Sequence, residues 1–195
     1  MTATTFRDAA AALAAAFHAG TLFGHVLPDP VTRARRLPWL FAGTLRHCRR
    51  HGHVLTDGAD AAAGWVPGGR LALGPVDLVR TGLVLTPLRF GPGATLRLER
   101  HERPTERRLV DALTPSTGYL WVLGVRPDRQ GTGAGGAMLR RVLDDMAAGG
   151  HDRCLLRTDD EPNVGFYRRH GFEVVEHCTD LKSGLPAWIM AAPTA

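Results

Sequence analysis

The chain has 195 residues, of which 44% are hydrophobic and 22% are charged. This balance is typical of a globular protein that buries a sizeable core, and it excludes a largely disordered chain. The formal net charge is +5, but only Lys182 among the 24 basic residues is a lysine, so the excess of arginine indicates genomic G+C bias as much as an anionic partner.

The first half of the chain predicts helices and one hairpin. Residues 5–18 and 31–51 show helical spacing of apolar residues, and Pro38 is expected to kink or restart the second helix. Residues 54–56 and 61–66 read as two strands joined by a turn at Asp57-Gly58. One or two short helices are expected within residues 71–98, and residues 102–117 read as a polar, mobile loop.

The second half alternates strands and helices. Strands are predicted at residues 119–125, 154–158, 172–177 and 188–191, with a helix over 133–148. A short helix is expected to begin at a capping Asn163 and to run to His170, with Gly171 in the left-handed conformation after it. This order predicts an α/β (α+β) protein with some parallel strand pairing.

Cysteine usage and the apolar runs bear on the compartment. Cys48, Cys154 and Cys178 form no CxxC pair, which favours reduced thiols over a zinc site or a disulfide framework. The apolar run at residues 9–16 is too short to cross a bilayer. The arginine clusters lack interleaved aromatic residues. We therefore expect a cytoplasmic protein without a metal, and with neither a nucleic-acid nor a membrane partner.

The most informative segment is a glycine-rich turn at residues 125–136, between a predicted strand and a predicted helix. Unpaired N–H groups at a helix N-terminus attract anions, and glycine allows a phosphate to approach the backbone closely. A mononucleotide P-loop would require lysine and then serine or threonine after the last glycine, but Ala137 follows Gly136. Gly131, Gly133 and Gly136 do match a dinucleotide-binding fingerprint, and a tight turn without a ligand is a further alternative. Only 59 residues follow Gly136, which is short for a doubly wound fold.

The pattern Val125-x-Pro127-x-x-Gln130-x-x-Gly133-x-Gly135 resembles the signature of the GNAT superfamily of N-acetyltransferases. A second segment, from Asn163 through Phe166-Tyr167 to Gly171-Phe172, resembles the downstream motif of that superfamily and stands at the expected distance. Within the superfamily, both motifs look most like the puromycin N-acetyltransferase-like branch. The resemblance implies a single domain over 1–195, with a mixed, mostly antiparallel sheet that splays at an acetyl-CoA site and is flanked by helices. Residues 1–117 would supply the acceptor side, and 118–195 the cofactor side and the C-terminal half.

The resemblance also implies a set of residues that bind acetyl-CoA. The backbone of Leu123, Gly124 and Val125 would pair with the pantetheine, provided that two central strands part after Val125. The turn would hold the pyrophosphate with its N–H groups and with the Gln130 and Thr132 side chains. The expected binding residues in and beyond the turn are Gln130, Gly131, Thr132, Gly133, Ala134, Gly135, Gly136, Asn163 and Phe166.

Tyr167 is the residue to which the resemblance gives chemistry. When an amine attacks the thioester of acetyl-CoA, the coenzyme A sulfur departs as a thiolate. A phenol near that sulfur can act as a general acid and protonate it. Its position four residues after Asn163 places both on one helix face. The alternative is a packed aromatic ring whose hydroxyl is hydrogen-bonded within the core.

The general base is not identified by the sequence, and Asp159, Asp160 and Glu161 are the candidates, although three consecutive acids also suit a solvated turn.

Other residues are candidates for the lining of the acceptor site. His25 and His101 are expected at the surface more than in a pocket. Strand alternation places Trp121 on one face with Tyr119 and Leu123. Members of the puromycin-like branch often carry Glu where this chain has Arg157. This difference keeps an anionic or neutral acceptor open as an alternative to a cationic amine.

Three functions remain open at this stage. The expected one is direct transfer of an acetyl group to the amine of a small molecule, such as an antibiotic or a metabolite, since no cysteine or serine stands in a nucleophile arrangement. The second is acetylation of a protein lysine or N-terminus, and the third is a non-catalytic sensor of acyl-CoA. The sequence does not indicate the oligomeric state.

Overall fold

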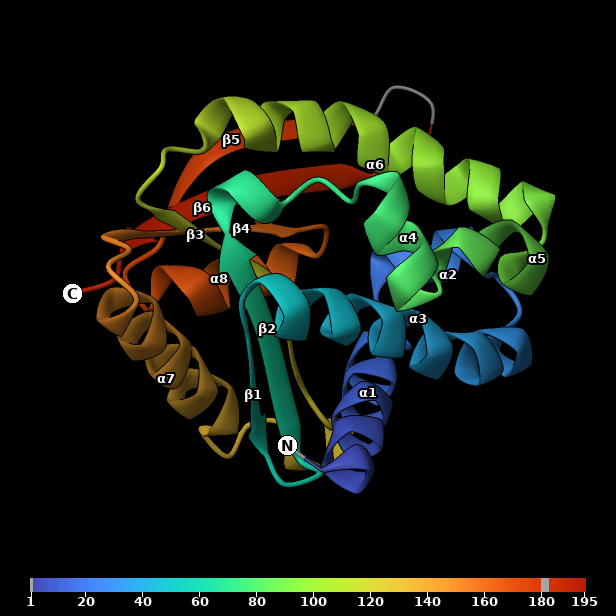
Figure 1. The fold of residues 1–195 in the computed structure, drawn as a ribbon, viewed down its shortest axis with the longest axis horizontal. Helices are drawn as coiled ribbons and strands as arrows, with labels where there is room; N and C mark the ends of the chain where they lie inside the picture. Colours follow the sequence, from blue (N-terminus) through green and yellow to red (C-terminus); the bar gives the residue numbers. More distant parts are fainter. Residues whose placement is uncertain (1, 180–182) are drawn as a thin grey trace.

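The computed structural model describes residues 2–179 and 183–195. Its strands are β1 (His53–Asp57), β2 (Ala61–Pro67), β3 (Thr117–Val125), β4 (Arg153–Thr158), β5 (Glu173–Thr179) and β6 (Pro186–Pro193). They form one sheet in the order β1-β2-β3-β4-β6-β5 (Figure 1), and every neighbouring pair is antiparallel except β3 and β4, which are parallel. The mixed α/β fold and the mostly antiparallel sheet are therefore confirmed.

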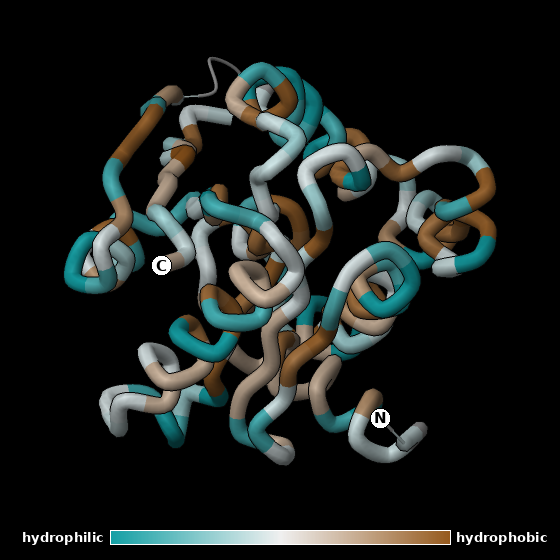
Figure 2. The backbone as a smooth tube through the Cα atoms, turned by 60° about the vertical axis from the view of Figure 1, so that its left-hand side comes forward, coloured by the Kyte–Doolittle hydropathy of each residue, from teal (hydrophilic) through white to brown (hydrophobic). Residues whose placement is uncertain are grey.

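The helices are α1 (Ala3–Phe17), α2 (Thr21–Val26), α3 (Pro30–His51), α4 (Pro75–Thr81), α5 (Thr86–Phe90), α6 (Pro92–Ala112), α7 (Ala134–Ala148) and α8 (Glu161–Arg168). Short 3₁₀ turns occupy Gly68–Arg70, Leu83–Leu85 and Pro127–Arg129. No described helix is both long enough and apolar enough to cross a membrane. Along most helices the colouring in Figure 2 alternates between hydrophilic and hydrophobic, as expected of helices that bury one face.

Two layers of helices cover the sheet (Figure 1). Helices α7 and α8 pack on one face, where Met138, Val142 and Met146 of α7 join the core as their spacing predicts. Helices α1 and α3 pack on the other face, where Leu13 and Leu45 are fully buried. Pro38 lies inside α3, which the structure assigns as one helix over its whole length.

The β1–β2 hairpin and the ends of the later helices follow the predicted local chemistry. Gly58 and Gly171 both have positive φ, the conformation that their turns require and that glycine adopts without strain. Helix α8, however, begins at Glu161 with Asp160 as its N-cap residue, so the prediction that Asn163 caps it is wrong. Asn163 lies inside the first turn of α8, where its side-chain amide donates to Thr158 Oγ1 over 3.2 Å.

The parting of the two central strands is confirmed, but it begins earlier than expected. Strands β3 and β4 pair only from Thr117↔Arg153 to Leu120↔Leu156. Beyond Leu120, β3 continues to Val125 with β2 on one edge and none of the described strands on the other. An open strand edge presents N–H and C=O groups to any extended ligand. The sheet therefore opens five residues before the expected point.

The prediction of a mobile loop at residues 102–117 is wrong. Most of this stretch belongs to α6, a helix of 21 residues that runs along the top of the molecule in Figure 1. Its buried positions include His101, Thr105 and Leu109, which recur at helical spacing. Two of these three are polar, so the buried face of α6 carried no apolar stripe. The preceding residues form α4, a 3₁₀ turn and α5, so the expectation of one or two short helices within residues 71–98 is confirmed, and α6 also begins there.

Candidate active site

The open edge of β3 carries a bulge at Trp121. Gly64 of β2 pairs with Val122, and the next residue, Trp65, pairs with Leu120, so Trp121 is the extra residue. A bulge of this kind re-aims side chains. Tyr119 and Trp121 share one face, with ring centroids 6.0 Å apart, whereas Leu123 packs with the α7 and α8 side. The expected common face of Trp121 and Leu123 is therefore wrong, because the bulge shifts the alternation.

The two residues after Leu123 are held from both faces. A Cβ on Gly124 would lie 2.8 Å from the Ala16 side chain, so β3 can pass this close to α1 only with glycine there. Val125 is buried, and its carbonyl oxygen accepts a hydrogen bond from Gln130 Nε2 over 3.1 Å. These contacts fix the position of the strand end that leads into the glycine-rich turn.

The turn itself is an open backbone cradle. Gly131 and Gly133 have φ of 77° and 88°, and a Cβ at either would meet nothing within 4 Å. The first hydrogen bond of α7 runs from Ala137 N–H to the Gly133 carbonyl, over 3.0 Å. The N–H groups that precede Ala137 therefore have no acceptor in the helix, which is the arrangement that binds phosphate.

The side chains of the turn hold the turn together. Thr132 Oγ1 donates to the Arg129 carbonyl over 2.8 Å, while Gln130 bonds Val125 as described and its N–H donates to the Pro127 carbonyl. In this structure the two side chains expected to contact phosphate are directed at the loop's own backbone, which leaves the glycine amides as the anion donors. Ala134 follows as the first residue of α7.

Gly135 and Gly136 bring α7 close to α8. A Cβ on Gly136 would lie 2.6 Å from the His170 ring, and one on Gly135 would lie 3.5 Å from Phe166. Gly136 thus serves packing, and Phe166 lies against the start of α7.

Tyr167 is buried beside Phe166 and Phe172, with ring centroids 5.1 and 5.4 Å away. Burial raises the pKa of the Tyr167 phenol, so the hydroxyl keeps its proton.

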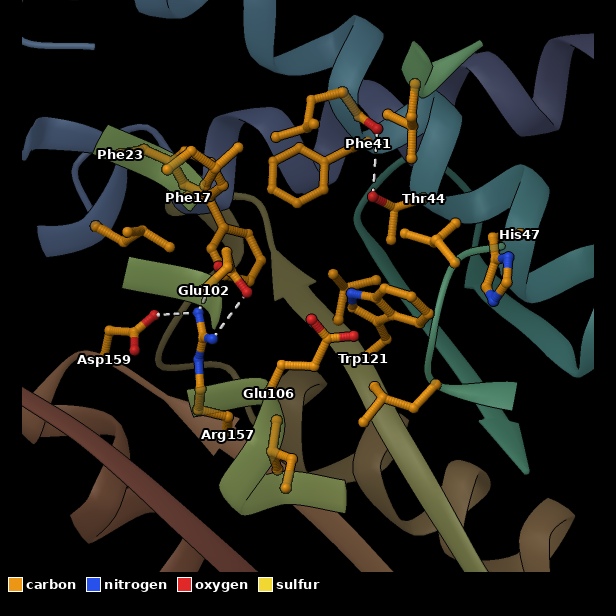
Figure 3. Close-up of a pocket in the computed structure, with 18 of the residues that line it drawn as sticks. Phe17, Phe23, Phe41, Thr44, His47, Glu102, Glu106, Trp121, Arg157 and Asp159 are labelled. Carbon is orange, nitrogen blue, oxygen red and sulfur yellow. Dashed lines mark hydrogen bonds and ion pairs between the residues drawn. The ribbon is translucent and has the colours of Figure 1, made fainter. Parts of the chain in front are cut away.

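A cavity of about 600 Å³ lies on the acceptor side of Tyr167. Its apolar part includes Phe17, Phe23 and Phe41 (Figure 3), which come from α1, α2 and α3. Further lining residues come from α4 to α6, from β3 and from the end of β4, and they include Trp121, Leu123, Asn163 and Tyr167. The cavity therefore joins the open edge of β3 to the proposed acid, and it has the size and apolar lining of a small-molecule site.

The charge in the cavity is dominated by carboxylates. Five acidic side chains line it (Glu99, Glu102, Glu106, Asp159 and Asp160), against the two guanidinium groups of Arg103 and Arg157. Arg157 is largely buried and bonds both Glu102 and Asp159 (Figure 3). Burial opposes its charge, but these carboxylates more than offset that and raise its pKa well above the usual range. Because these carboxylates already pair with it, Arg157 offers no unpaired positive charge to an anionic acceptor.

The three acids proposed from the sequence have separate positions. Asp159 bonds both Arg157 and His101, at 3.0 and 3.1 Å, and Asp160 accepts the Thr21 N–H at 2.9 Å. Glu161 is exposed in the first turn of α8. Neither aspartate is free to take a proton without losing a partner.

The two histidines considered from the sequence differ in burial. His101 is fully buried, so the expectation of a surface histidine is wrong for it, whereas His25 on α2 is half-buried.

Glu106 is the site residue that the sequence analysis missed. It projects from α6 into the cavity beside Trp121 (Figure 3) and is half-buried. Within residues 2–179 and 183–195, no ion pair or hydrogen bond engages its carboxylate. Glu106 follows Glu102 by one helical turn, so the two carboxylates share a face on a helix. The sequence predicted a loop for this segment, and in a loop that spacing carries no meaning. A carboxylate in this setting can hold an ammonium group and accept its proton.

Comparison with known proteins identifies the part of the chain that carries these features. Residues 93–172 match the model of the acetyltransferase (GNAT) family. These residues extend from the start of α6 through β3, the glycine-rich turn, α7 and β4 to the end of α8. This segment is similar to the GNAT acetyltransferase family.

Two curated relatives are similar to part of the chain. The mycothiol acetyltransferase of Corynebacterium aurimucosum is 38% identical over 73 residues, which are 36% of this chain and 24% of that protein. The mycothiol acetyltransferase of Clavibacter sepedonicus is 44% identical over 55 residues, which are 27% of this chain and 18% of that protein. The chain thus spans about a quarter or less of the length of these relatives.

Solved structures of similar chains include two acetyltransferases. A nourseothricin acetyltransferase is 23% identical with a TM-score of 0.39, covering 41% of this chain and 51% of its own. An aminoglycoside 6'-N-acetyltransferase complexed with coenzyme A is 18% identical with a TM-score of 0.38, covering 40% and 59%. These values describe a limited overlap with each structure.

Proposed function

We propose that this protein transfers an acetyl group from acetyl-CoA to the amine of a small, cationic molecule. The observation that carries the proposal is the cavity of about 600 Å³, which contacts the open edge of β3, Tyr167 and an acidic wall at once. An acetyl donor laid along β3 would bring its thioester toward Tyr167. An ammonium group drawn by the acidic wall would reach it from the other side.

The residues that would bind acetyl-CoA follow from this placement. The backbone of Leu123 and Val125 would pair with the pantetheine amides along the open edge of β3. The N–H groups at Gly131, Gly133 and Gly135 would hold the pyrophosphate at the start of α7. These assignments rest on the open backbone cradle and on the strand edge that β4 leaves unpaired.

The chemistry is a direct attack in a ternary complex. The Glu106 carboxylate would hold the ammonium group and accept one of its protons, which gives a neutral amine. The amine nitrogen then forms a bond to the thioester carbon, the carbon–sulfur bond breaks, and the nitrogen loses its second proton to water, which leaves a neutral amide. Tyr167 gives its phenolic proton to the departing thiolate and recovers a proton from solvent. The product amide no longer carries the positive charge that Glu106 recognises.

The walls of the cavity favour a small molecule over a protein. Helices α4, α5 and α6 all contribute residues to the lining, so they would cover the acceptor side. A lysine side chain or a protein N-terminus would require an open groove. The puromycin-like branch and a cytoplasmic location remain parts of this proposal, as does acetyl rather than a longer acyl group.

The experiment is a thiol-release assay with acetyl-CoA and a panel of amine antibiotics, polyamines, amino acids and lysine peptides. Turnover with cationic small molecules alone supports the proposal. Acetylation of peptides alone would favour a protein acetyltransferase. Binding of acetyl-CoA by calorimetry with no turnover across the panel would favour the non-catalytic sensor.

A further inference from the structure

Two histidines and one aspartate meet on the side of α3 that faces α4. A ring nitrogen of His47, a ring nitrogen of His51 and a carboxylate oxygen of Asp77 all lie within 4.8 Å of one another. The histidines are one helical turn apart on α3, so their rings lie on one face, with centroids 4.7 Å apart and planes tilted by 45°. Asp77 comes from the first turn of α4.

One nitrogen of His47 is buried without a partner. The Nε2 atom lies 2.9 Å from the Arg70 carbonyl oxygen, and because a carbonyl only accepts, Nε2 must carry the proton. The Nδ1 atom therefore keeps its lone pair, yet it is buried and has no hydrogen-bond partner among the described residues. His47 is 1% exposed, and a buried polar atom left unpaired is costly unless something binds it.

This arrangement around His47 is one that metal-binding histidines use. A ligating imidazole donates its second nitrogen to a carbonyl or carboxylate, which fixes the tautomer and aims the lone pair at the ion. Here the Arg70 carbonyl performs that task. The lone pair on Nδ1 is then available to an ion.

The other two residues are reachable from solvent. The side chains of His51 and Asp77 are 15% and 20% exposed, and His51 Nε2 lies 2.7 Å from Asp77 Oδ1. Arg50 is the nearest cation, with its Nε 3.7 Å from the same oxygen. Its side chain is 44% exposed and is free to turn toward solvent. An ion and a bound water therefore have a route to this cluster.

We infer that His47, His51 and Asp77 form a site for a divalent transition-metal ion of the zinc class. Two imidazoles and one carboxylate are ligands of zinc, and water completes a tetrahedron. Ligand atoms about 2.0–2.1 Å from zinc stand about 3.3 Å apart. The three ligand atoms lie within 4.8 Å of one another, so the side chains would draw together on binding. The ion would tie α4 to α3 and so fix one wall of the cavity, which Leu78 of α4 and His47 both line.

The test is a titration of chelator-treated protein with zinc sulfate, followed by calorimetry and by thermal unfolding. We expect one equivalent to bind, and zinc at about 100 times the dissociation constant to raise the unfolding midpoint by roughly 5–10 °C. Cobalt at the same site should give the visible absorption of a four-coordinate ion. His51→Gln and Asp77→Asn should each weaken zinc binding at least 10-fold, and both positions are exposed enough for the variants to fold.

His53→Gln is the matched control, because His53 lies two residues after His51 and also pairs with an aspartate, Asp145, at 2.6 Å, but belongs to no cluster of three potential metal ligands among the described residues. It should bind zinc as the unchanged protein does. The inference is overturned if no zinc binds, if His51→Gln binds as well as the unchanged protein, or if His53→Gln loses binding equally. None of these readouts depends on acetyl transfer, so the outcome is separate from that of the proposed function.

Discussion

The guanidinium of Arg157 donates two hydrogen bonds to the carboxylate of Glu102, at 2.9 and 2.8 Å, and so joins β4 to α6. Asp159 takes a third bond from the same guanidinium, at 3.0 Å, and His101 lies 3.1 Å from the other oxygen of Asp159. The charge-assisted pair is bidentate, which orients both partners. The network positions α6, and with it Glu106, over the cavity.

Replacing Arg157 should therefore destabilise the fold. Arg157→Met leaves Glu102 without its partner and Asp159 with His101 alone, and the free energy of unfolding should fall by about 2–3 kcal/mol, the lower end for a buried pair because Glu102 is 40% exposed. Denaturant unfolding measures this. Arg103→Met removes the partner of Glu99 on the exposed side of α6 and should cost less than about 0.5 kcal/mol. Equal losses in both variants would contradict a structural role for the Arg157 network.

Removal of the Tyr167 hydroxyl should slow the reaction without harming the cofactor site. Tyr167→Phe keeps the ring contacts with Phe166 and Phe172, and kcat should fall by roughly 10²-fold, the scale of a general acid. Thiol release measures kcat, and calorimetry should show little change in acetyl-CoA affinity. Unchanged turnover would make Tyr167 a packing residue.

The glycine-rich turn should bind the pyrophosphate. Gly133→Asp puts an anion and a strained backbone at φ 88°, and acetyl-CoA binding should be lost in calorimetry. Gly150→Asp is the control, because Gly150 also has positive φ and open space but follows the far end of α7. Acetyl-CoA affinity that survives in Gly133→Asp would remove the turn from the cofactor site.

Glu106 should recognise the cationic acceptor. Glu106→Gln keeps the shape of the side chain and removes its charge, so KM for a cationic amine should rise about 10-fold or more while acetyl-CoA affinity stays constant, in line with a lost charged contact. Asp111→Asn removes one negative charge from the same helix outside the cavity and should leave KM unchanged. A similar KM in both variants would show that Glu106 does not contact the acceptor.

Stability should fall in acid as Asp159 is protonated. Burial raises the pKa of Asp159, but Arg157 and His101 outweigh it and hold that pKa below the ordinary value of 3.8. A depressed carboxyl pKa contributes stability above the unfolded-state value, and this is lost as the pH falls through the folded value. The stability difference between the unchanged protein and Asp159→Asn should therefore be largest above pH 4 and shrink below it. A difference that is constant with pH in denaturant unfolding would contradict this assignment.

Local patterns in the sequence predicted much of the cofactor half. The glycine-rich turn, the strand before it and the helix after it depend on residues within a few positions of one another, so spacing alone indicates them. The spacing of Asn163 and Tyr167 on one short helix is likewise local, although the start of that helix was misplaced by the competing cap at Asp160.

The acceptor side was decided by tertiary structure. Helix α6 buries His101 and Thr105, and it pairs Glu102 with Arg157 across 55 positions of the chain. Periodicity identifies a buried face by its apolar residues, so a helix whose buried face is polar looks like a loop until its partners are in place. The early parting of β3 and β4, the bulge at Trp121 and the free carboxylate of Glu106 all arise between elements distant in sequence. The sequence by itself therefore determined the glycine-rich motif, and only the packing of α6 on β4 decided which charges line the cavity.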